Sequence, residues 1–120
     1  MKYLMLLHSN PEAFASQTPE QMQAAMEFFN QLYQETTAAG ELVDTAGLAH
    51  PSQVQTVRHH DGHTVATDGP FAESKEVMAS YAIYDVASEE RAMELANRVS
   101  QATGGTVEVW PVMDFGGTEM

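Results

Sequence analysis

The spacing of hydrophobic and polar residues changes several times along the chain, and each change marks a predicted element. Residues 2–8 form an apolar run without helical spacing and end at a turn cluster, 9–11, which predicts a central strand. Thr18, followed by a proline and by Gln21, forms a capping box, so a helix should begin there. Apolar residues then recur at spacings of three and four up to Gly40, which predicts about five turns of helix.

The middle of the chain is predicted to form strands. Residues 41–51 are rich in turn-forming types around one apolar pair, which predicts a short strand and an irregular connection. Residues 54–60 and 63–67 both alternate between apolar and polar types, and Asp61 and Gly62 stand between them. Because Asp-Gly favours the two-residue turns with positive φ that close hairpins, this stretch predicts a β-hairpin.

The last third repeats the strand, helix and strand of the first. Residues 77–86 have the β-branched and aromatic content of a long strand. Ser88 is a suitable N-cap for a helix that should end at two glycines beginning at Gly104, and residues 106–113 form a final strand. Residues 114–120 have little to bury and are expected to be a flexible tail or to contact a second subunit.

The order of these elements indicates a single domain over residues 1–120. Strand, helix and strand occur twice with a hairpin between them, which predicts an α+β ferredoxin-like sandwich, an antiparallel sheet with two helices on one face. The other face of the sheet would then lack cover, although the strands at 2–8 and 77–86 are apolar on both faces. We therefore expect a homodimer in which two sheets face each other.

Charge and composition restrict the function classes. The 120 residues include 17 acidic and 5 basic side chains, a net charge of −12, and this field repels phosphate, so we expect no binding to nucleic acid or to membranes. The chain has no cysteine, which excludes disulfides and cysteine nucleophiles. Its initial apolar run is too short for a signal peptide, so a cytoplasmic protein is expected. We find no phosphate-binding loop, nucleophile elbow or zinc-helix motif, and expect no cofactor.

The string Asp-Gly-Pro-Phe-Ala-Glu-Ser-Lys-Glu at residues 68–76 resembles the signature of the DGPF-type proteins in the YCII-related family. Further similar stretches lie at residues 56–58, 80–81 and 104–109, and the resemblance spans residues 2–114. It implies the dimeric α+β barrel, in which two ferredoxin-like sheets face each other across a homodimer. It also implies a functional link to extracytoplasmic-function sigma factors, beside which such proteins are often encoded.

The resemblance does not imply one defined reaction, although some YCII-type relatives are thought to use a His-Asp pair in small-molecule chemistry. Family members often have arginine where this chain has Trp110, and Gly-Gly where it has Ala79 and Ser80. If that arginine binds an anionic ligand in relatives, this chain has lost or changed the ligand.

Within the signature, Asp68, Phe71 and Lys75 are candidate ligand-binding or catalytic residues. The Asp68 carboxylate could accept hydrogen bonds from the amides that follow it and only fix the loop, or it could accept a proton or anchor a ligand. Lys75 would hold that carboxylate ionised or bind an anion. The neighbouring Glu73 and Glu76 are expected to form a solvated charge cluster.

Three further residues are candidates outside the signature. His8 ends the first strand, where pockets open in such sandwiches, and is either a general acid/base oriented by Asp68 or a strand-end residue without a chemical role. Arg58 is the only arginine inside a predicted strand and either pairs with a carboxylate or binds an anionic ligand. Tyr81 is either a core side chain or a ligand contact.

His60 and His63 should face each other beside the hairpin turn, but two imidazoles make an incomplete metal site, so no metal is predicted. The sequence therefore favours a small-molecule-binding or regulatory homodimer with a small polar ligand. Two alternatives remain open: an enzyme that uses His8 and Asp68 on a small polar metabolite, and a purely structural dimer module.

Overall fold

The computed structural model describes residues 1–70 and 75–113. Its elements are, in chain order, β1 (Lys2–Ser9), α1 (Pro11–Ala15), α2 (Pro19–Ala38), β2 (Leu42–Gly47), a 3₁₀ turn η1 (Pro51–Gln53), β3 (Gln55–His60), β4 (His63–Asp68), β5 (Val77–Asp85), α3 (Glu89–Thr103) and β6 (Thr106–Pro111). Within these residues, no helix is long and apolar enough to cross a membrane.

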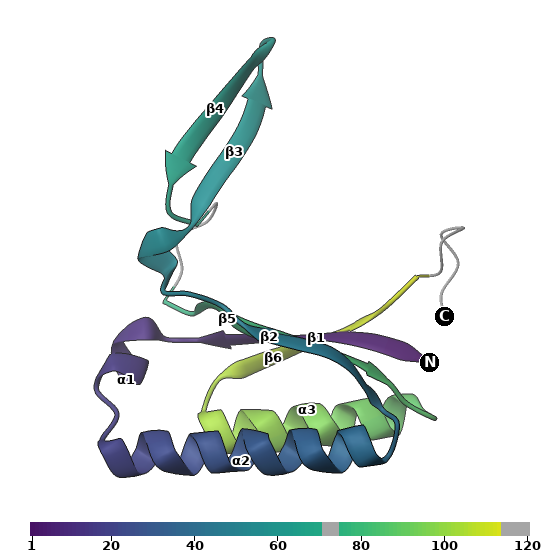
Figure 1. Cartoon of the computed structure of the whole chain (residues 1–120). Coiled ribbons are helices and arrows are strands. Elements are labelled where there is room, and N and C mark those ends of the chain that lie inside the picture. Colours follow the sequence, from purple (N-terminus) through teal and green to yellow (C-terminus); the bar gives the residue numbers. More distant parts are fainter. Residues whose placement is uncertain (71–74, 114–120) are drawn as a thin grey trace.

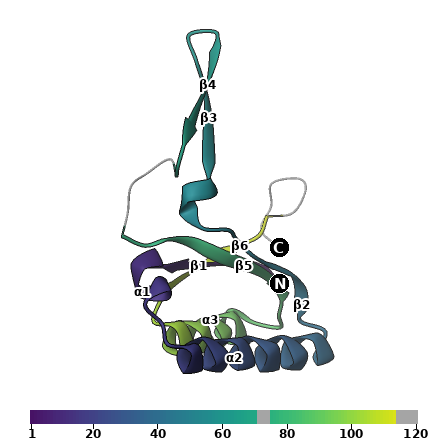
Figure 2. The ribbon, with the colours of Figure 1, turned by 60° about the vertical axis from the view of Figure 1, so that its left-hand side comes forward.

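Four of the strands form one antiparallel sheet in the order β2-β5-β1-β6. Helices α2 and α3 lie side by side along one face of this sheet, and the other face carries no second layer in the described part of the chain (Figures 1 and 2). The predicted ferredoxin-like α+β sandwich, with both long helices on one face, is confirmed.

The ends of the helices follow the local signals of the sequence. The Thr18 hydroxyl accepts a hydrogen bond from the Gln21 amide at 3.1 Å, and the Gln21 side chain accepts one from the Thr18 amide at 2.9 Å, so the capping box forms as predicted. Gly104 ends α3 with a φ of 72°, the left-handed conformation that glycine adopts without strain.

Helix α1 was not predicted, because five residues are too few for a hydrophobic period. Residues 9–11 were expected to be a turn only. Instead the Asn10 side chain accepts hydrogen bonds from the amides of Glu12 and Ala13, and Pro11 occupies the first helical position. These are start signals for a helix, and α1 leads directly into α2.

The core lies between the sheet and the helices. Along β1, Tyr3, Met5 and Leu7 are buried against α2 and α3, while the residues between them are half-buried on the opposite face. The rest of the core consists of Leu32, Ala82, Tyr84, Val86, Ala92, Leu95, Ala96 and Val99. The burial of side chains along β1 therefore alternates with a period of two, although both faces of the strand are apolar.

The face of the sheet that points away from the helices is called here the open face. Strand register places Leu4 opposite Ile83 and Trp110, and Leu6 opposite Tyr81 and Glu108. Side chains directly opposite each other in antiparallel strands lie on the same face, so the open face is largely hydrophobic. Its centre is made of Leu4, Leu6, His8, Tyr81, Ile83, Glu108 and Trp110.

Strands β3 and β4 form a hairpin that projects away from the sheet (Figures 1 and 2). Its turn is the predicted one, with φ of 49° at Asp61 and 79° at Gly62. All residues of the two strands except Thr56 are exposed. The projection enlarges the molecule, whose radius of gyration is 16.4 Å, compared with about 14 Å for a compact domain of this length.

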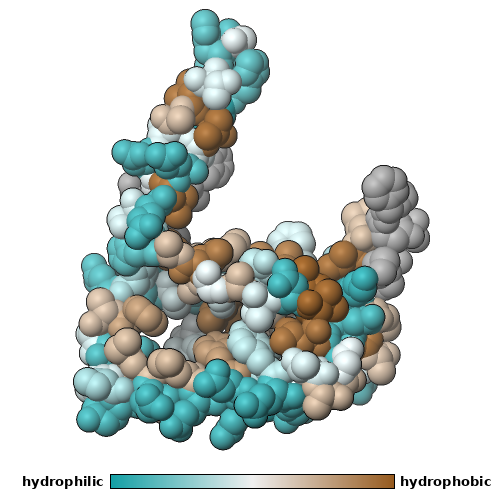
Figure 3. Space-filling view, in the orientation of Figure 1, coloured by the Kyte–Doolittle hydropathy of each residue, from teal (hydrophilic) through white to brown (hydrophobic). Residues whose placement is uncertain are grey.

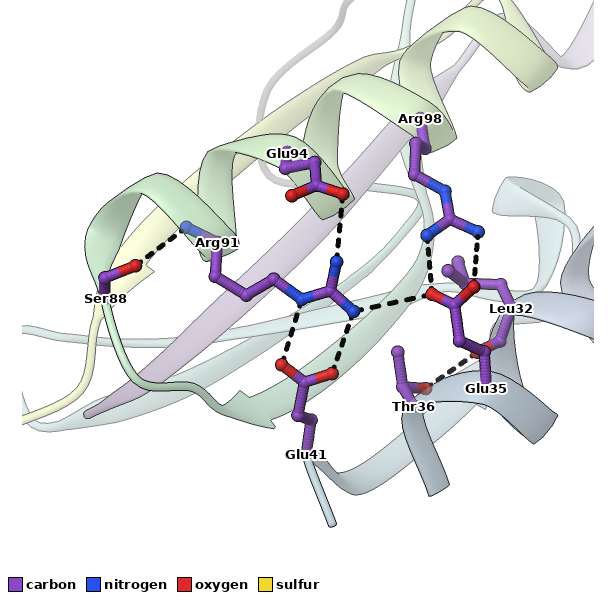
Figure 4. Close-up of polar contacts among 8 residues, drawn as sticks. All are labelled: Leu32, Glu35, Thr36, Glu41, Ser88, Arg91, Glu94 and Arg98. Atoms are coloured by element: carbon purple, nitrogen blue, oxygen red, sulfur yellow. Dashed lines mark hydrogen bonds and ion pairs between the residues drawn. The ribbon is translucent and has the colours of Figure 1, made fainter. Parts of the chain in front are cut away.

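A cluster of ion pairs joins the two long helices to the start of β2 (Figure 4). The guanidinium of Arg91 donates two hydrogen bonds of 3.0 Å to the Glu41 carboxylate, one from Nε and one from Nη2. Arg91 also contacts Glu94 and Glu35, and Arg98 donates to Glu35 at 2.6 Å. Hydrogen bonding from Arg98, with a smaller contribution from Arg91, lowers the pKa of Glu35.

Candidate functional site

A cavity of about 490 Å³ opens between the sheet and the helices at the carboxyl end of β1. Figure 3 shows the molecule hollowed between α2 and the sheet. The lining residues come from nearly every element around this end of the fold: Leu7, Ser9, Asn10, Ala13, Phe14, Gln17, Ala25, Phe29, Tyr33, Thr45, Ala46, Gly47, Glu76, Ala79, Ser80 and residues 103–105. The volume is in the range of pockets that hold small organic ligands.

The walls of the cavity are mostly apolar. Phe14 from α1 and Phe29 from α2 provide aromatic surface, and small alanine side chains, among them Ala13 and Ala25, leave the space open. Phe14 has 60% of its surface exposed, which is unusual for an aromatic side chain inside a fold. An apolar ligand in the cavity would remove this surface from water.

A short chain of hydroxyl groups lies in the wall. The Thr45 hydroxyl is 2.8 Å from the Tyr81 carbonyl oxygen and 3.2 Å from the Tyr33 hydroxyl. Because a carbonyl oxygen can only accept, Thr45 donates its proton to it, and Tyr33 then donates to Thr45. The Tyr33 oxygen then keeps its lone pairs as acceptors.

Glu76 is the only charged residue among the described residues that line the cavity. Its carboxylate accepts a hydrogen bond of 2.7 Å from the Thr106 hydroxyl, which fixes it beside the start of β6. Glu76 is also the last residue of the signature string 68–76. A pocket between sheet and helices therefore lies at the end of β1, as predicted, and Glu76 is the one described residue of the signature that lines it. Residues 71–74 lie outside the described part of the chain.

The floor of the cavity depends on close contact between β6 and β1. A Cβ atom at Gly105 would lie 2.6 Å from the His8 carbonyl oxygen and 2.9 Å from Cδ1 of Leu7. Both distances are too short for real contacts, so only glycine fits without a shift of the backbone. Gly105 thereby sets the position of the last residues of β1.

His8 lies on the open face and not in the cavity wall. Its Nε2 atom is 2.6 Å from Oε1 of Glu108, the distance of a strong charge-assisted hydrogen bond. On the same face, the Tyr81 hydroxyl donates to the Asp44 carboxylate at 3.0 Å. This hydrogen bond, with the charge of Asp44, raises the pKa of Tyr81. The open face thus carries two acidic partners within a hydrophobic surface.

The structure places the other predicted site residues apart from one another. Asp68 ends β4, opposite Gln55 in the hairpin, so it belongs to a different sheet from His8. Within residues 1–70 and 75–113, His8 and Asp68 share no hydrogen bond or ion pair. The proposed pairing therefore stays a prediction of the sequence, and Glu108 is the carboxylate that contacts the ring.

Arg58 lies on β3 beside a shallow hollow of about 340 Å³ that the hairpin forms on one of its faces. It is exposed, whereas its position inside a strand favoured burial, because no element of the described part of the chain packs over the hairpin. Lys75 is exposed and does not line the cavity. Phe71 falls outside the described residues.

Three functional candidates were not singled out from the sequence. Glu108 and Asp44 each contact an open-face side chain, and Tyr33 lines the cavity. The alternation of β6 could have placed Glu108 on the open face, but only the strand register shows that it reaches His8. His60 and His63 lie opposite each other across the hairpin, as predicted. The described ranges contain no group of three or more histidine, aspartate or glutamate residues that could hold a metal ion.

Comparison with known proteins agrees with the resemblance to the YCII-related family. The family model of the YCII-related domain matches residues 1–116. An uncharacterised protein of Rhizobium meliloti (strain 1021) is 30% identical over 114 residues, which cover 93% of this chain and 92% of the relative. The similarity therefore extends over the sheet, both long helices and the hairpin.

Proposed function

The chain belongs to the YCII-related family, and from this premise we propose that it is a homodimeric protein that binds a small molecule in the cavity between sheet and helices. The observation that carries the proposal is the cavity itself, about 490 Å³ in volume with apolar walls. Packed protein interiors leave few voids larger than a water molecule. A hollow of this size beside a solid core is consistent with a binding site.

The polar groups around the cavity support the same proposal. Tyr33 of α2, Thr45 of β2 and Glu76, which precedes β5, line one largely apolar space. A few polar groups in an apolar pocket are the arrangement that orients a ligand. A chain that needed this end only for stability would gain by filling it with larger side chains, because each buried methylene contributes about 0.8 kcal/mol.

Two neighbouring alanines in α2 allow a matched test. Ala25 lines the cavity and Ala24 is exposed outside it, so we compare Ala25→Phe with Ala24→Phe. A ligand at 100 times its dissociation constant should add about 2.7 kcal/mol to stability in the wild type and in Ala24→Phe. A metabolite library screened by thermal shift should find compounds that stabilise these two proteins and not Ala25→Phe. A screen in which every hit also stabilises Ala25→Phe to the same extent contradicts the proposal.

The homodimer is proposed from the open face. Leu4, Leu6 and Ile83 lie together on it, and Trp110 at its edge is 54% exposed. Hydrophobic side chains gather over the sheet in Figure 3. A contiguous apolar surface of this kind is typical of an interface between subunits, and a second copy offers an identical surface.

The dimer is tested by placing a charge on the open face. Leu6→Glu should convert a species of twice the chain mass of 13.1 kDa into a monomer, as measured by light scattering after gel filtration. Met93→Glu is the control, because Met93 is 51% exposed on α3, away from the sheet. A wild-type protein that remains monomeric at high micromolar concentration contradicts the homodimer.

An enzyme is the second candidate function, and the contact between His8 and Glu108 favours it. A carboxylate 2.6 Å from an imidazole orients the ring, as in general acid/base catalysis. The test is to incubate each compound from the screen with the wild type and with His8→Gln and to follow product formation by NMR. Conversion by the wild type alone would support catalysis, and a bound compound that stays unchanged would leave the binding function.

A further inference from the structure

We infer that the β3–β4 hairpin packs against the second subunit and forms the dimer interface together with the open face. The hairpin, residues 55–68, is called here the arm. This inference rests on the proposed function, because it names the segment with which each subunit of the proposed homodimer holds its partner.

The arm carries exposed hydrophobic side chains on both of its faces. Val57 stands opposite Ala66 on one face and has 63% of its surface exposed. Val65 stands opposite Arg58 on the other face, since successive residues of a strand alternate between faces, and is 47% exposed. A two-stranded hairpin by itself is only marginally stable in water. The arm therefore gains stability where a second surface covers at least one of its faces.

The arm rises on the same side of the sheet as the open face. In Figures 1 and 2 the arm stands above the sheet, whereas α2 and α3 lie below it. Each strand of the arm has six residues, which span about 20 Å at about 3.3 Å per residue. Two sheets that pack face to face lie about 10 Å apart. A second sheet on the open face would thus lie at about half the height of the arm, and the upper half would extend along the next layer of that subunit.

The exposed hydrophobic surface continues from the open face to the arm. Met78 stands opposite His8, at the end of the open face, and is itself exposed. It also lines a hollow of about 450 Å³ at the base of the arm, together with the exposed side chains of Leu48 and Val54. Val54 directly precedes β3. One partner surface can therefore cover the open face, the hollow and the arm together.

The amount of exposed surface fits a second copy of the chain. The chain exposes 8351 Å², whereas a compact monomer of 13.1 kDa exposes about 6,400 Å². Two copies that each buried the excess of about 2,000 Å² would share an interface of about 4,000 Å², and permanent homodimers bury about 2,000–5,000 Å². A second copy also carries an identical arm, so a two-fold axis gives both subunits the same cover.

Hydrogen exchange tests the inference on the full chain. The amides of residues 55–68 are followed by mass spectrometry in the wild type, in the monomeric variant Leu6→Glu and in its control Met93→Glu. We expect these amides to exchange at least about tenfold more slowly in the wild type and in Met93→Glu than in Leu6→Glu, because packing against a partner suppresses local opening. Dilution of the wild type below its dimer dissociation constant should raise the exchange rate to that of Leu6→Glu.

A cross-link identifies what the arm contacts. The chain has no cysteine, so Thr64→Cys places a single thiol on the arm, and this thiol can carry a benzophenone photo-cross-linker. Illumination should produce a covalent species of twice the chain mass of 13.1 kDa, and Leu6→Glu in the same chain should abolish it. The same label on Met93→Cys, at an exposed position of α3, should leave the chains unlinked.

The outcomes separate the arm from the homodimer itself. The inference is overturned, and the dimer on the open face stands, if a dimeric wild type exchanges its arm amides as fast as Leu6→Glu and Thr64→Cys links no better than Met93→Cys. A wild type that stays monomeric at high micromolar concentration overturns both proposals. Covalent dimers that persist when Leu6→Glu is added would show that the arm contacts another copy outside the open-face dimer, and would also overturn the inference.

Discussion

Replacing Arg91 by methionine should destabilise the fold substantially, because one guanidinium holds three elements together. Arg91 begins on α3 and binds Glu41, which precedes β2, while its other contacts reach Glu94 and Glu35. Hydrogen bonding to Glu41 raises the pKa of Arg91, so the guanidinium keeps its charge at any accessible pH. Methionine keeps the apolar stem and removes only the charged fork.

The magnitude follows from how well the pair is shielded. The Arg91 side chain is 25% exposed and the Glu41 side chain 14%, and their two hydrogen bonds are both 3.0 Å. Exposed ion pairs contribute about 0.2–1 kcal/mol, and hydrogen bonds to charged groups about 1.5–3 kcal/mol when water is excluded. Between these limits we expect a loss of about 2 kcal/mol. For a 120-residue domain this lowers the melting temperature by about 8 °C.

The assay is thermal unfolding at neutral pH, followed by circular dichroism and repeated in 0.5 M salt. Glu94→Gln is the control, because it breaks a contact of the same guanidinium whose acidic partner is 59% exposed, and it should cost less than about 0.5 kcal/mol. High salt should reduce the difference between wild type and Arg91→Met only in part. A melting temperature for Arg91→Met within 2 °C of that for Glu94→Gln would refute the reasoning.

Three further predictions follow from single side chains. Burial raises the pKa of Tyr84 from 10.0 to about 12. This group should not affect the free energy of unfolding below pH 10, but between pH 10 and 12 only the unfolded state ionises, and the free energy of unfolding should fall by about 3 kcal/mol. In alkaline denaturation, Tyr84→Phe should not show this loss. Gly105→Ala should lower stability by about 1–3 kcal/mol and shift the His8 ring resonances in NMR spectra, and unchanged spectra would contradict the close approach. Hydrogen bonding from Arg98 lowers the pKa of Glu35, so the stability difference between wild type and Glu35→Gln should be present above pH 4.5 and disappear as the pH falls below it. A difference that persists at low pH would argue against the ion pair.

The fold could be predicted from the sequence because its strongest local signals agree with one another. The Asp61-Gly62 turn, the Thr18 cap and the period of the helices each specify a local structure, and only a few topologies join those structures in this order. The family signature pointed to the same architecture. Helix α1 escaped prediction because its start signal at Asn10 is not followed by enough residues to show a period.

The site could be predicted only in part, since side-chain contacts across strands depend on register. The end of β1 was identified as the place where a pocket opens, and the cavity lies there. The partner of His8 was not found, because seventeen acidic residues offer many carboxylates and only the register between β1 and β6 shows that Glu108, opposite Leu6, lies beside His8. No sequence pattern reports that register.

Helix α1 should unfold locally more readily than helix α3. Helix α1 has no buried residue, whereas Leu32 and Leu95 lie fully enclosed on the longer helices. Amide hydrogens of α1 should therefore exchange with solvent much faster than those of α3, through local opening that leaves the rest intact. Mutations near α1 could then tune how fast small molecules pass in and out while global stability is set elsewhere, so the two properties are free to evolve independently.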